Sequence, residues 1–410
     1  MKSSTGRWVN GANFFDREAE LTLLESRVRD GNHVLLTGQR RMGKTSVTRE
    51  LGRRLESQGW TFLFTDVEDA ICAEDVIAEI ARATHPIRPI SSRLIQDMRR
   101  WFEGNVDQIS AHDFSVKFRA GLDAGSWRRH GDTLINTCAE HDKPVLLVMD
   151  ELPIFLKRLL RDEDGAKRVD QFLSWLRRAL QTHCDGSLVI IVSGSIGLKP
   201  LVERLGLSDR INYLDPFRLG PWDRENSIEC LEKLANAYDL AIEKDVGNAV
   251  YDALGIGIPH HVQSFFARLR DFAAIQKRAP ITAADVQEVY QNELLGPSGQ
   301  NDLVHYETRL KEGLEDESFS IAMEILAEAA TQEVFTSQSR KCLDALYSEL
   351  VDDTRARITN VLDVLVHDGY LEPGADGYRF PSRLLKDWWS ARFRDHHTPL
   401  CSRIADDGTA

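Results

Sequence analysis

Short apolar runs alternate with amphipathic segments over the first half of the chain. The apolar runs lie at 33–37, 60–67, 145–150 and 188–193. Segments with helical spacing follow three of them, at 44–57, 74–84 and 169–183. Runs without polar alternation are typical of strands covered on both faces, and strands that alternate with helices form parallel sheets. The pattern therefore predicts an α/β fold built on a parallel sheet with crossover helices.

Beyond residue 221 the pattern becomes helical only. Helical spacing is found at 224–238, 244–254, 260–277 and 283–294, and again at 321–330, 339–350 and 354–368. The segment GPSGQND (296–302) has the composition of a linker. The segment GYLEPGADGYRF (369–380) predicts a short hairpin that turns at 374–377. Three helices followed by a two-stranded wing are the order of a winged helix-turn-helix.

The stretch 86–142 interrupts the alternation of strands and helices. It has an irregular pattern, and we interpret it mainly as a solvated surface insertion with an edge strand expected at 113–119. We assign it no functional role.

Composition excludes several classes of protein. A chain of 410 residues suggests two or three domains, and 42% hydrophobic with 28% charged residues excludes a disordered or low-complexity protein. No apolar run approaches the roughly 18 to 20 residues that cross a bilayer, and the N-terminus lacks the apolar core of a signal peptide, so we expect a cytoplasmic protein. The six cysteines are scattered without metal-ligand spacing, and we expect them to be reduced thiols.

Residues 38–45, GQRRMGKT, match the phosphate-binding pattern G-x-x-x-x-G-K-[ST] directly after an apolar strand and at the start of a helix. The glycines let successive backbone N–H groups point at phosphate oxygens, and the helix N-terminus adds its positive end. Lys44 is expected to neutralise the β- and γ-phosphates of ATP, and Thr45 to bind Mg²⁺. The residues expected to contact nucleotide are Gly38, Gln39, Arg40, Arg41, Met42, Gly43, Lys44, Thr45 and Ser46.

Carboxylates follow the third apolar run, where a P-loop protein needs them. Asp150 is expected to hold Mg²⁺, usually through water, and Glu151 to accept a proton from the attacking water. The fourth run ends in Ser193, with Ser195 close behind. We favour Ser193 as a contact to the γ-phosphate or the attacking water, and a serine that only caps a turn is the alternative.

Six segments together resemble one family of ATPases. They are FFDREAEL (14–21), LLTGQRRMGKTS (35–46), VLLVMDELPIFL (145–156), LVIIVSGSIGL (188–198), GIGIPHHVQSFF (255–266) and YRFPSRLLKDWW (378–389). The family is that of the archaeal-type ATPases, an AAA+-like branch related to the STAND NTPases and to the origin-recognition ATPases. The resemblance covers about residues 12–393 and implies a P-loop ATPase core at 12–220 with the insertion 86–142, a helical lid at 221–295, a linker at 296–317 and a winged helix at 318–396.

The resemblance also implies roles for residues outside the P-loop. Phe15 and Arg17 are expected against the adenine, with Asp16 where the family usually has glycine. Pro259 and His260, in the Gly-x-Pro turn of the lid, are expected near the phosphates. Phe15 as a hydrophobic staple and His260 as a plain helix-start residue are the alternatives.

An arginine finger that reaches a neighbouring subunit is also implied by the resemblance. It is expected at Arg204 or Arg210, and Arg210 is our choice.

Three classes of function remain open: an ATP-driven molecular switch, a DNA-associated ATPase of replication, transposition or mobile-element and defence type, and a partner-dependent regulator with negligible turnover. Residues 318–410 hold ten Lys and Arg against fifteen Asp and Glu, and the whole chain carries −13. Since phosphate neutralisation dominates DNA affinity, this balance favours the switch. Its expected partners are ATP, an unidentified protein and further copies of the chain, with duplex DNA as a possible ligand of the winged helix.

Overall fold

The computed structural model describes residues 1–4, 6–87, 110–123, 125–183, 186–194, 197–350 and 352–407. The chain forms two compact units. We call residues 16–38 and 44–219 the sheet unit, and residues 1–15, 39–43 and 220–410 the helical unit. Within the described residues, no helix is long and apolar enough to span a membrane.

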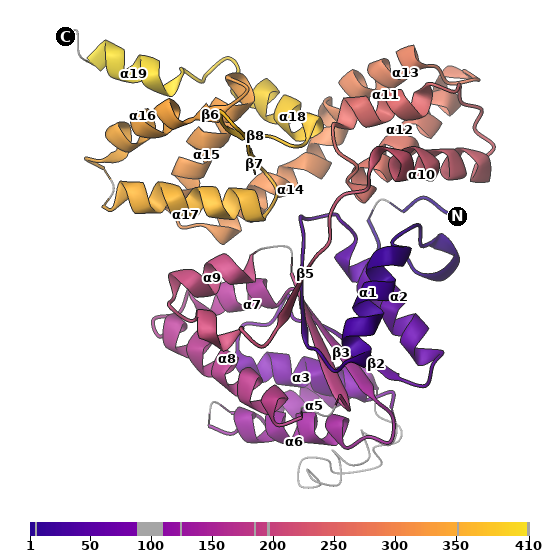
Figure 1. The fold of residues 1–410 in the computed structure, drawn as a ribbon, viewed down its shortest axis with the longest axis vertical. Helices are drawn as coiled ribbons and strands as arrows, with labels where there is room; N and C mark the ends of the chain where they lie inside the picture. Colours follow the sequence, from indigo (N-terminus) through magenta and orange to yellow (C-terminus); the bar gives the residue numbers. More distant parts are fainter. Residues whose placement is uncertain are drawn as a thin grey trace. The chain divides into compact units, whose positions relative to one another are not determined.

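The sheet unit is built on five parallel strands in the order β2-β3-β4-β1-β5 (Figure 1). Their bounds are β1 (Val34–Thr37), β2 (Thr61–Asp66), β3 (Val145–Asp150), β4 (Leu188–Ser193) and β5 (Asp215–Arg218). Every residue of β3 and β4 is buried, as their uninterrupted apolar sequence predicts. In register, Asp66 lies opposite Asp150, and Leu36 lies opposite Ser193. The carboxyl ends of the strands therefore share one edge of the sheet.

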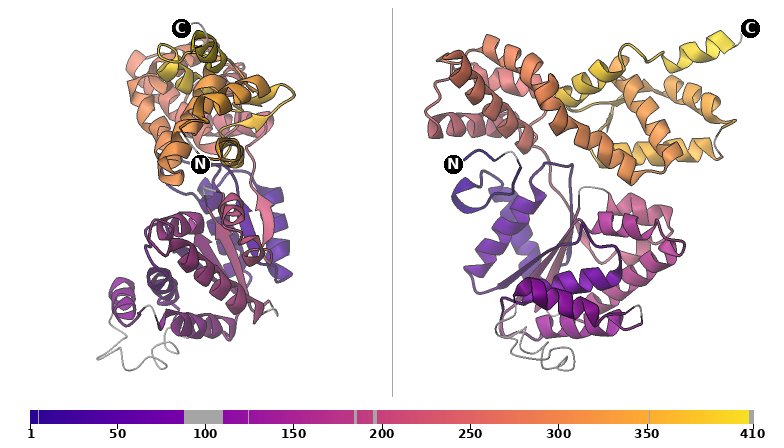
Figure 2. Two further views of the ribbon diagram at one scale, coloured as in Figure 1. Left: turned by 90° about the vertical axis from the view of Figure 1, so that its left-hand side faces the viewer. Right: turned by 180° about the vertical axis from the view of Figure 1, so that it is seen from behind.

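Helices cover both faces of this sheet. Figures 1 and 2 show α1 and α2 on one face and the other helices on the opposite face. The bounds are α1 (Glu18–Arg29), α2 (Lys44–Glu56), α3 (Ala73–Thr84), α5 (Ala111–Ala120), α6 (Trp127–Ala139), α7 (Leu152–Leu159), α8 (Gly165–Gln181), α9 (Leu198–Arg204) and the 3₁₀ turn η4 (Ser208–Arg210). This arrangement confirms the expected parallel α/β sheet with crossover helices.

The edge strand expected at 113–119 is wrong, because this segment is helix α5. Ser110 caps the helix by accepting a hydrogen bond from the backbone N–H of Asp113, and Phe114 and Phe118, four residues apart, are both buried. Helix α6 also lies in the stretch 86–142, so its described part is more regular than expected. Residues 88–109 lie outside the described residues.

The helical unit combines helices with a three-stranded sheet in the order β6-β8-β7. Its helices are η1 (Gly11–Asn13), α10 (Arg224–Ala237), α11 (Val246–Leu254), α12 (Pro259–Gln276), α13 (Ala283–Val289), η5 (Tyr290–Leu294), α14 (Pro297–Gly313), α15 (Asp316–Thr331), α16 (Ser337–Tyr347), α17 (Thr354–His367), α18 (Arg383–Phe393) and α19 (Leu400–Asp407). Its strands are β6 (Phe335–Thr336), β7 (Glu372–Pro373) and β8 (Gly377–Arg379). One hydrophobic cluster runs from Trp222 to Leu400.

The segment expected as a linker, 296–317, is mostly helical, because helix α14 occupies Pro297–Gly313. Pro297 stands in the first turn of the helix, where a missing N–H costs nothing. Leu303, Tyr306 and Leu310 are at most 3% exposed, and their spacing of three and four residues gives α14 one buried face. The small and polar residues that resemble a linker are therefore the start of a packed helix.

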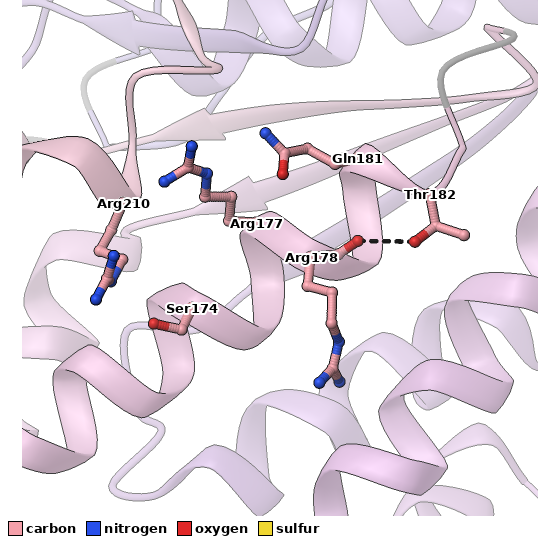
Figure 3. A pocket seen from close by; sticks show the side chains of 6 residues that line it. All are labelled: Ser174, Arg177, Arg178, Gln181, Thr182 and Arg210. Atoms are coloured by element: carbon pink, nitrogen blue, oxygen red, sulfur yellow. Dashed lines mark hydrogen bonds between the residues drawn. The ribbon is translucent and has the colours of Figure 1, made fainter.

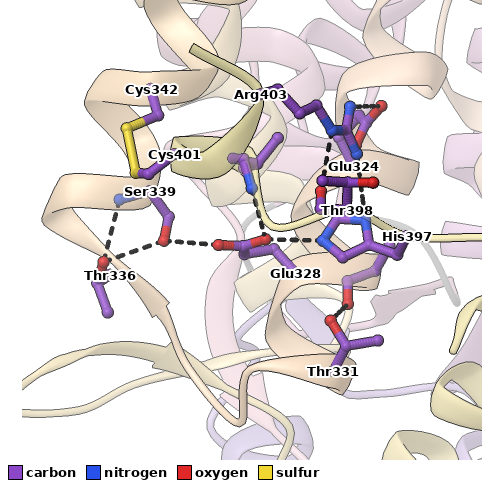
Figure 4. Close-up of polar contacts among 12 residues, drawn as sticks. Glu324, Glu328, Thr331, Thr336, Ser339, Cys342, His397, Thr398, Cys401 and Arg403 are labelled. Atoms are coloured by element: carbon purple, nitrogen blue, oxygen red, sulfur yellow. Dashed lines mark hydrogen bonds and ion pairs between the residues drawn. A yellow bond between two sulfur atoms is a disulfide. The ribbon is translucent and has the colours of Figure 1, made fainter. Parts of the chain in front are cut away.

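A disulfide joins Cys342 of α16 to Cys401 of α19, which corrects the expectation of reduced thiols for this pair (Figure 4). Beside it, the buried carboxylate of Glu328 accepts hydrogen bonds from Ser339 Oγ at 3.0 Å and the Leu400 N–H at 3.2 Å, and His397 Nε2 lies 2.7 Å away. Burial by itself would raise the pKa of Glu328, but these hydrogen bonds hold it below its usual value. The C-terminal segment is thus bonded to both α15 and α16.

We expect the disulfide to stabilise the helical unit. The bond spans 59 residues, and the lost chain entropy of a loop of that length corresponds to about 4 kcal/mol. Cys401→Ser should therefore lower the unfolding midpoint, measured by urea denaturation. A reductant should lower the midpoint of the wild-type chain to the same value.

Cys72→Ser, which removes a half-buried free thiol of the sheet unit, is the control and should keep the response to reductant. An unfolding midpoint that is the same with and without reductant would contradict the stabilisation.

Candidate nucleotide-binding site

The P-loop connects β1 to α2, and its backbone requires glycine at two positions. Gly38 has φ +151° and Gly43 has φ +88°. A Cβ on Gly38 would lie 2.5 Å from the carbonyl oxygen of Leu219, which follows β5. The glycine at 38 thus lets the loop leave β1 directly beside the neighbouring strand.

Lys44 and Thr45 begin helix α2, where backbone N–H groups have no partner within the helix. Lys44 is 6% exposed, and its ammonium donates a hydrogen bond to the carbonyl of Gly38 at 2.9 Å. The ammonium therefore lies back over the loop. A buried cation in this position adds to the positive end of the helix and favours an anionic ligand.

The carboxylate of Asp150, at the end of β3, is hydrogen-bonded by side chains from two other elements of the sheet unit. Its Oδ2 accepts a hydrogen bond from Thr45 Oγ1 on α2 at 2.7 Å, and its Oδ1 accepts one from Ser193 Oγ at the end of β4. Asp150 is 3% exposed and Ser193 is fully buried. Carboxylate and hydroxyl oxygens are the ligands that Mg²⁺ prefers, so Thr45 and Asp150 fit a Mg²⁺ that also binds substrate phosphates. Ser195 lies outside the described residues.

Glu151 directly follows Asp150 in the left-handed backbone region, with φ +59°, and caps helix α7. Its Oε2 lies 3.7 Å from the position that a Cβ on Gly194 would occupy. That Cβ would also lie 2.5 Å from Pro153, so the turn after β4 requires glycine. The carboxylate of Glu151 therefore lies beside the end of β4, on the same edge of the sheet as Asp150.

Two charged side chains near Asp150 were missed by the sequence analysis. Arg49, one turn after Thr45 on α2, lies with its guanidinium 3.8 Å from the ring centre of Phe64. Burial lowers the pKa of Arg49, while the charges of Asp150 and Asp66 oppose that effect. Asp66 ends β2 as Asp150 ends β3, and burial raises its pKa. An acidic residue at the end of a second strand is the signal that could have revealed it.

The rest of the P-loop, residues 39–43, belongs to the helical unit. There the guanidinium of Arg41 contacts both ring nitrogens of His260, with Nη1 2.8 Å from Nδ1. His260 is the second residue of α12, directly after Pro259 in its first turn. The structure thus brings together two residues that the sequence analysis placed near the phosphates.

The residues expected near the adenine occupy a sharply bent segment. Asp16 and Arg17 both have positive φ, +58° and +74°, so Asp16 adopts the backbone region that favours the family's glycine. In the helical unit, Phe15 packs edge-on against Trp222 at 5.3 Å between ring centres. In the sheet unit, Arg17 is 4% exposed and pairs with Glu20 at 2.6 Å.

Arg210 lies in η4 of the sheet unit, away from the P-loop in sequence. Its Nε donates to Asp170 of α8 at 2.8 Å, and its Nη1 pairs with Asp209. With five polar residues of α8 and its C-terminus, it lines an open pocket of about 320 Å³ (Figure 3). Arg204, the alternative finger, is exposed at the end of α9.

Comparisons with known proteins agree with this geometry. Residues 13–191 match the family model described as an AAA ATPase domain. The Walker-type ATPase PABY2304 of Pyrococcus abyssi is 16% identical, with a TM-score of 0.63, over 95% of this chain and 99% of its own. The ORC2 protein of Aeropyrum pernix is 13% identical, with a TM-score of 0.54, over 94% of this chain and 98% of its own. The search of curated proteins found no match.

The two structures are similar to this chain in fold over nearly their whole length. The evidence for ATPase activity is the match to the family model. The matched segment contains the P-loop, Asp150 and Glu151. The chain therefore contains an AAA ATPase domain in residues 13–191, as the expected resemblance to AAA+-like P-loop ATPases implies.

Proposed function

We propose that the chain is a Mg²⁺-dependent ATP-hydrolysing switch of AAA+/STAND type. In this proposal α10–α13 form the lid, α15–α18 with β6–β8 form a winged helix, and the nucleotide state sets their position and thereby partner binding. The observation that carries the proposal is the Asp150 carboxylate, bonded by Thr45 from the P-loop helix and by Ser193 from β4, with Glu151 next in the chain.

Each residue of this edge has a distinct task in hydrolysis. Lys44 binds the β- and γ-phosphates, and Thr45 and Asp150 hold Mg²⁺, which neutralises charge on the phosphate oxygens. Glu151 takes a proton from the attacking water. Ser193, bonded to Asp150, orients that carboxylate and stands beside the γ-phosphate position.

Residues outside the P-loop complete the nucleotide contacts in this proposal. His260, which contacts Arg41, and Pro259 approach the phosphates, and Phe15 with Arg17 approaches the adenine. The Aeropyrum pernix ORC2 protein, which is similar to this chain in fold, was solved as ADPNP–ADP complexes. That similarity supports an adenine nucleotide as the ligand here.

Ion pairs in the C-terminal region favour a protein as the regulated partner. Arg355, at the start of α17, lies 3.4 Å from Asp344, and Arg379 on β8 lies 3.2 Å from Glu372. Arg357 pairs with Glu315, directly before α15, at 3.2 Å and with Glu317, in the first turn of α15, at 3.1 Å. A winged helix that binds DNA needs Lys and Arg side chains to neutralise phosphates. Here the arginines of α17 and β8 already face carboxylates.

Lys44→Ala should abolish ATP binding or reduce it below detection, because it removes the cation that neutralises the phosphates. Isothermal titration with ATP and Mg²⁺ measures this. Lys199→Ala, which removes an exposed lysine of α9, is the control and should bind as the wild type does. Unchanged affinity and turnover in Lys44→Ala would contradict the site.

Glu151→Gln should retain ATP binding and lose hydrolysis by about 100-fold or more, the size of a lost general base. The amide keeps the shape of the side chain and leaves the contact of Asp150 with Mg²⁺ intact, so the ATP-bound form should accumulate. Phosphate release and bound nucleotide are measured in parallel. Wild-type turnover in this variant would place the base elsewhere.

If Arg210 acts across an interface between copies, turnover per subunit should rise with protein concentration, and Arg210→Ala should flatten that rise without changing ATP affinity. The best-known arginine fingers contribute about 10³ to 10⁵ in rate, so partial assembly should be visible. Lys199→Ala, which removes an exposed cation of the neighbouring helix α9, is the control and should keep the rise, while Arg204→Ala tests the alternative finger.

Duplex DNA added at several salt concentrations tests the alternative partner. If DNA assembles the protein, the rise in turnover per subunit should occur at lower protein concentration when DNA is present. This displacement of the concentration dependence should shrink steeply as the salt concentration increases. Constant turnover over a hundredfold dilution, with Arg210→Ala like the wild type, would exclude the finger.

A further inference from the structure

The tip of the P-loop is covered by residues of the helical unit. Gln39 is 7% exposed and Met42 is 3% exposed, although neither lies in a helix or strand. Two side-chain contacts of the loop tip lie within that unit, one of Gln39 just beyond the end of α17 and one of Arg41 at the start of α12. Both contacts involve side chains of the loop whose backbone is expected to bind phosphate.

The first contact is between Gln39 and Gly369. Gly369 follows α17 with φ +77°, and the Tyr370 N–H closes the turn by donating to Leu365 O at 2.8 Å. A Cβ on Gly369 would lie 2.7 to 2.9 Å from Cδ, Oε1 and Cγ of Gln39. The side chain of Gln39 therefore lies directly on the bare Cα of this glycine, and a larger residue at 369 would displace the Gln39 side chain.

The second contact is between Arg41 and His260, and its support is the adjacent His261. His261 is 3% exposed, and its Nε2 lies 3.2 Å from the hydroxyl of Tyr306 on α14. Burial, with the charges of His260 and Arg41, lowers the pKa of His261 well below its usual value. A neutral imidazole bonded to Tyr306 therefore orients the first turn of α12, which carries His260.

Tyr306 connects the two contacts. The Tyr306 hydroxyl contacts the ring of His261, which follows His260 in the chain. The Tyr306 backbone carbonyl accepts a hydrogen bond at 2.8 Å from the hydroxyl of Tyr370, which follows Gly369. The rings of Tyr306 and Tyr370 pack edge-on at 5.8 Å. One buried tyrosine on α14 thus contacts the chain neighbours of both residues that touch the loop tip.

We propose that Tyr306 is a positioning residue that holds Gly369 and His260 against the P-loop tip and thereby slows nucleotide exchange. This inference rests on the proposed nucleotide site. The backbone of residues 39–43 surrounds the phosphates in a P-loop, so bound nucleotide leaves only when the loop opens. Opening requires the packed contacts of Gln39 and Arg41 to break, and close-packed contacts separate in a discrete step rather than gradually. The position of the turn after α17 then governs how fast ADP departs.

The test is the release rate of a fluorescent ADP analogue, N-methylanthraniloyl-ADP, from the full chain after mixing with excess ADP. Tyr306→Phe removes the hydroxyl that meets His261, and Gly369→Ala places a methyl group against Gln39. Coupling between sites commonly amounts to factors of about 5 to 150, so each variant should accelerate release by about fivefold or more. The rate of single-turnover hydrolysis should stay as in the wild type, because no group at Asp150 or Glu151 changes.

Matched controls separate this effect from a general loss of packing. Tyr290→Phe removes another buried tyrosine hydroxyl of the same unit, which donates to Asp387 at 2.8 Å. Gly59→Ala places alanine at a positive φ of +93° with no neighbour within 4 Å of its Cβ. Both should release the analogue at the wild-type rate. If Gly369→Ala does not fold, as judged by circular dichroism, Tyr306→Phe decides the question.

The outcomes distinguish this inference from the function on which it rests. A wild-type chain that does not bind the analogue would overturn the proposed nucleotide site. Binding by the wild type, with unchanged or slower release from Tyr306→Phe, would overturn the role of Tyr306 while leaving the site in place. Acceleration in Tyr290→Phe equal to that in Tyr306→Phe would also overturn it.

Discussion

The carboxylate of Asp150 is the group on which the arrangement of the site depends. A buried carboxylate without partners would be costly, and here hydroxyls from α2 and β4 bond both of its oxygens. Because Thr45, Asp150 and Ser193 come from three elements, these two hydrogen bonds hold the start of the P-loop helix and the ends of the central strands in register. The carboxylate and hydroxyl oxygens that form these hydrogen bonds are also of the kind that binds a hard cation and its phosphate ligand.

The glycines and the strained residues around this carboxylate serve the same geometry. Gly38 and Gly194 stand where a Cβ would strike Leu219 or Pro153, and Glu151 adopts a left-handed backbone at the first residue after β3. Non-glycine residues in that backbone region are uncommon and carry a cost that the surrounding structure must offset. In this case the strained backbone places a second carboxylate, that of Glu151, at the sheet edge directly after Asp150.

In the helical unit, the residues before and after α14 share one core with it. Tyr306 and Leu310 of α14 belong to the same cluster as Phe265 of α12 and Trp389 of α18. Helices joined by a loose linker would move independently, whereas helices that share one core with α14 are displaced together. This continuous core is the physical basis on which the proposed coupling of nucleotide state to a distant surface rests.

The sequence determined the four apolar strands, the P-loop and its carboxylates, because burial on both faces demands continuous apolar runs and because phosphate binding demands glycines and a lysine at fixed spacing. Each of these is a local requirement, met within a short stretch of the chain. The polar strand β5 was not predicted, since a four-residue edge strand needs no apolar run.

Tertiary structure alone decided the rest. Helix α5 carries Phe114 and Phe118, whose burial depends on a neighbouring helix, and α14 begins with residues that by composition favour a loop. The Cys342–Cys401 bond and the links of Tyr306 to His261 and Tyr370 join residues that are 45 to 64 positions apart in the chain. Such pairings depend on how separate elements pack against each other, and no spacing along the chain encodes them.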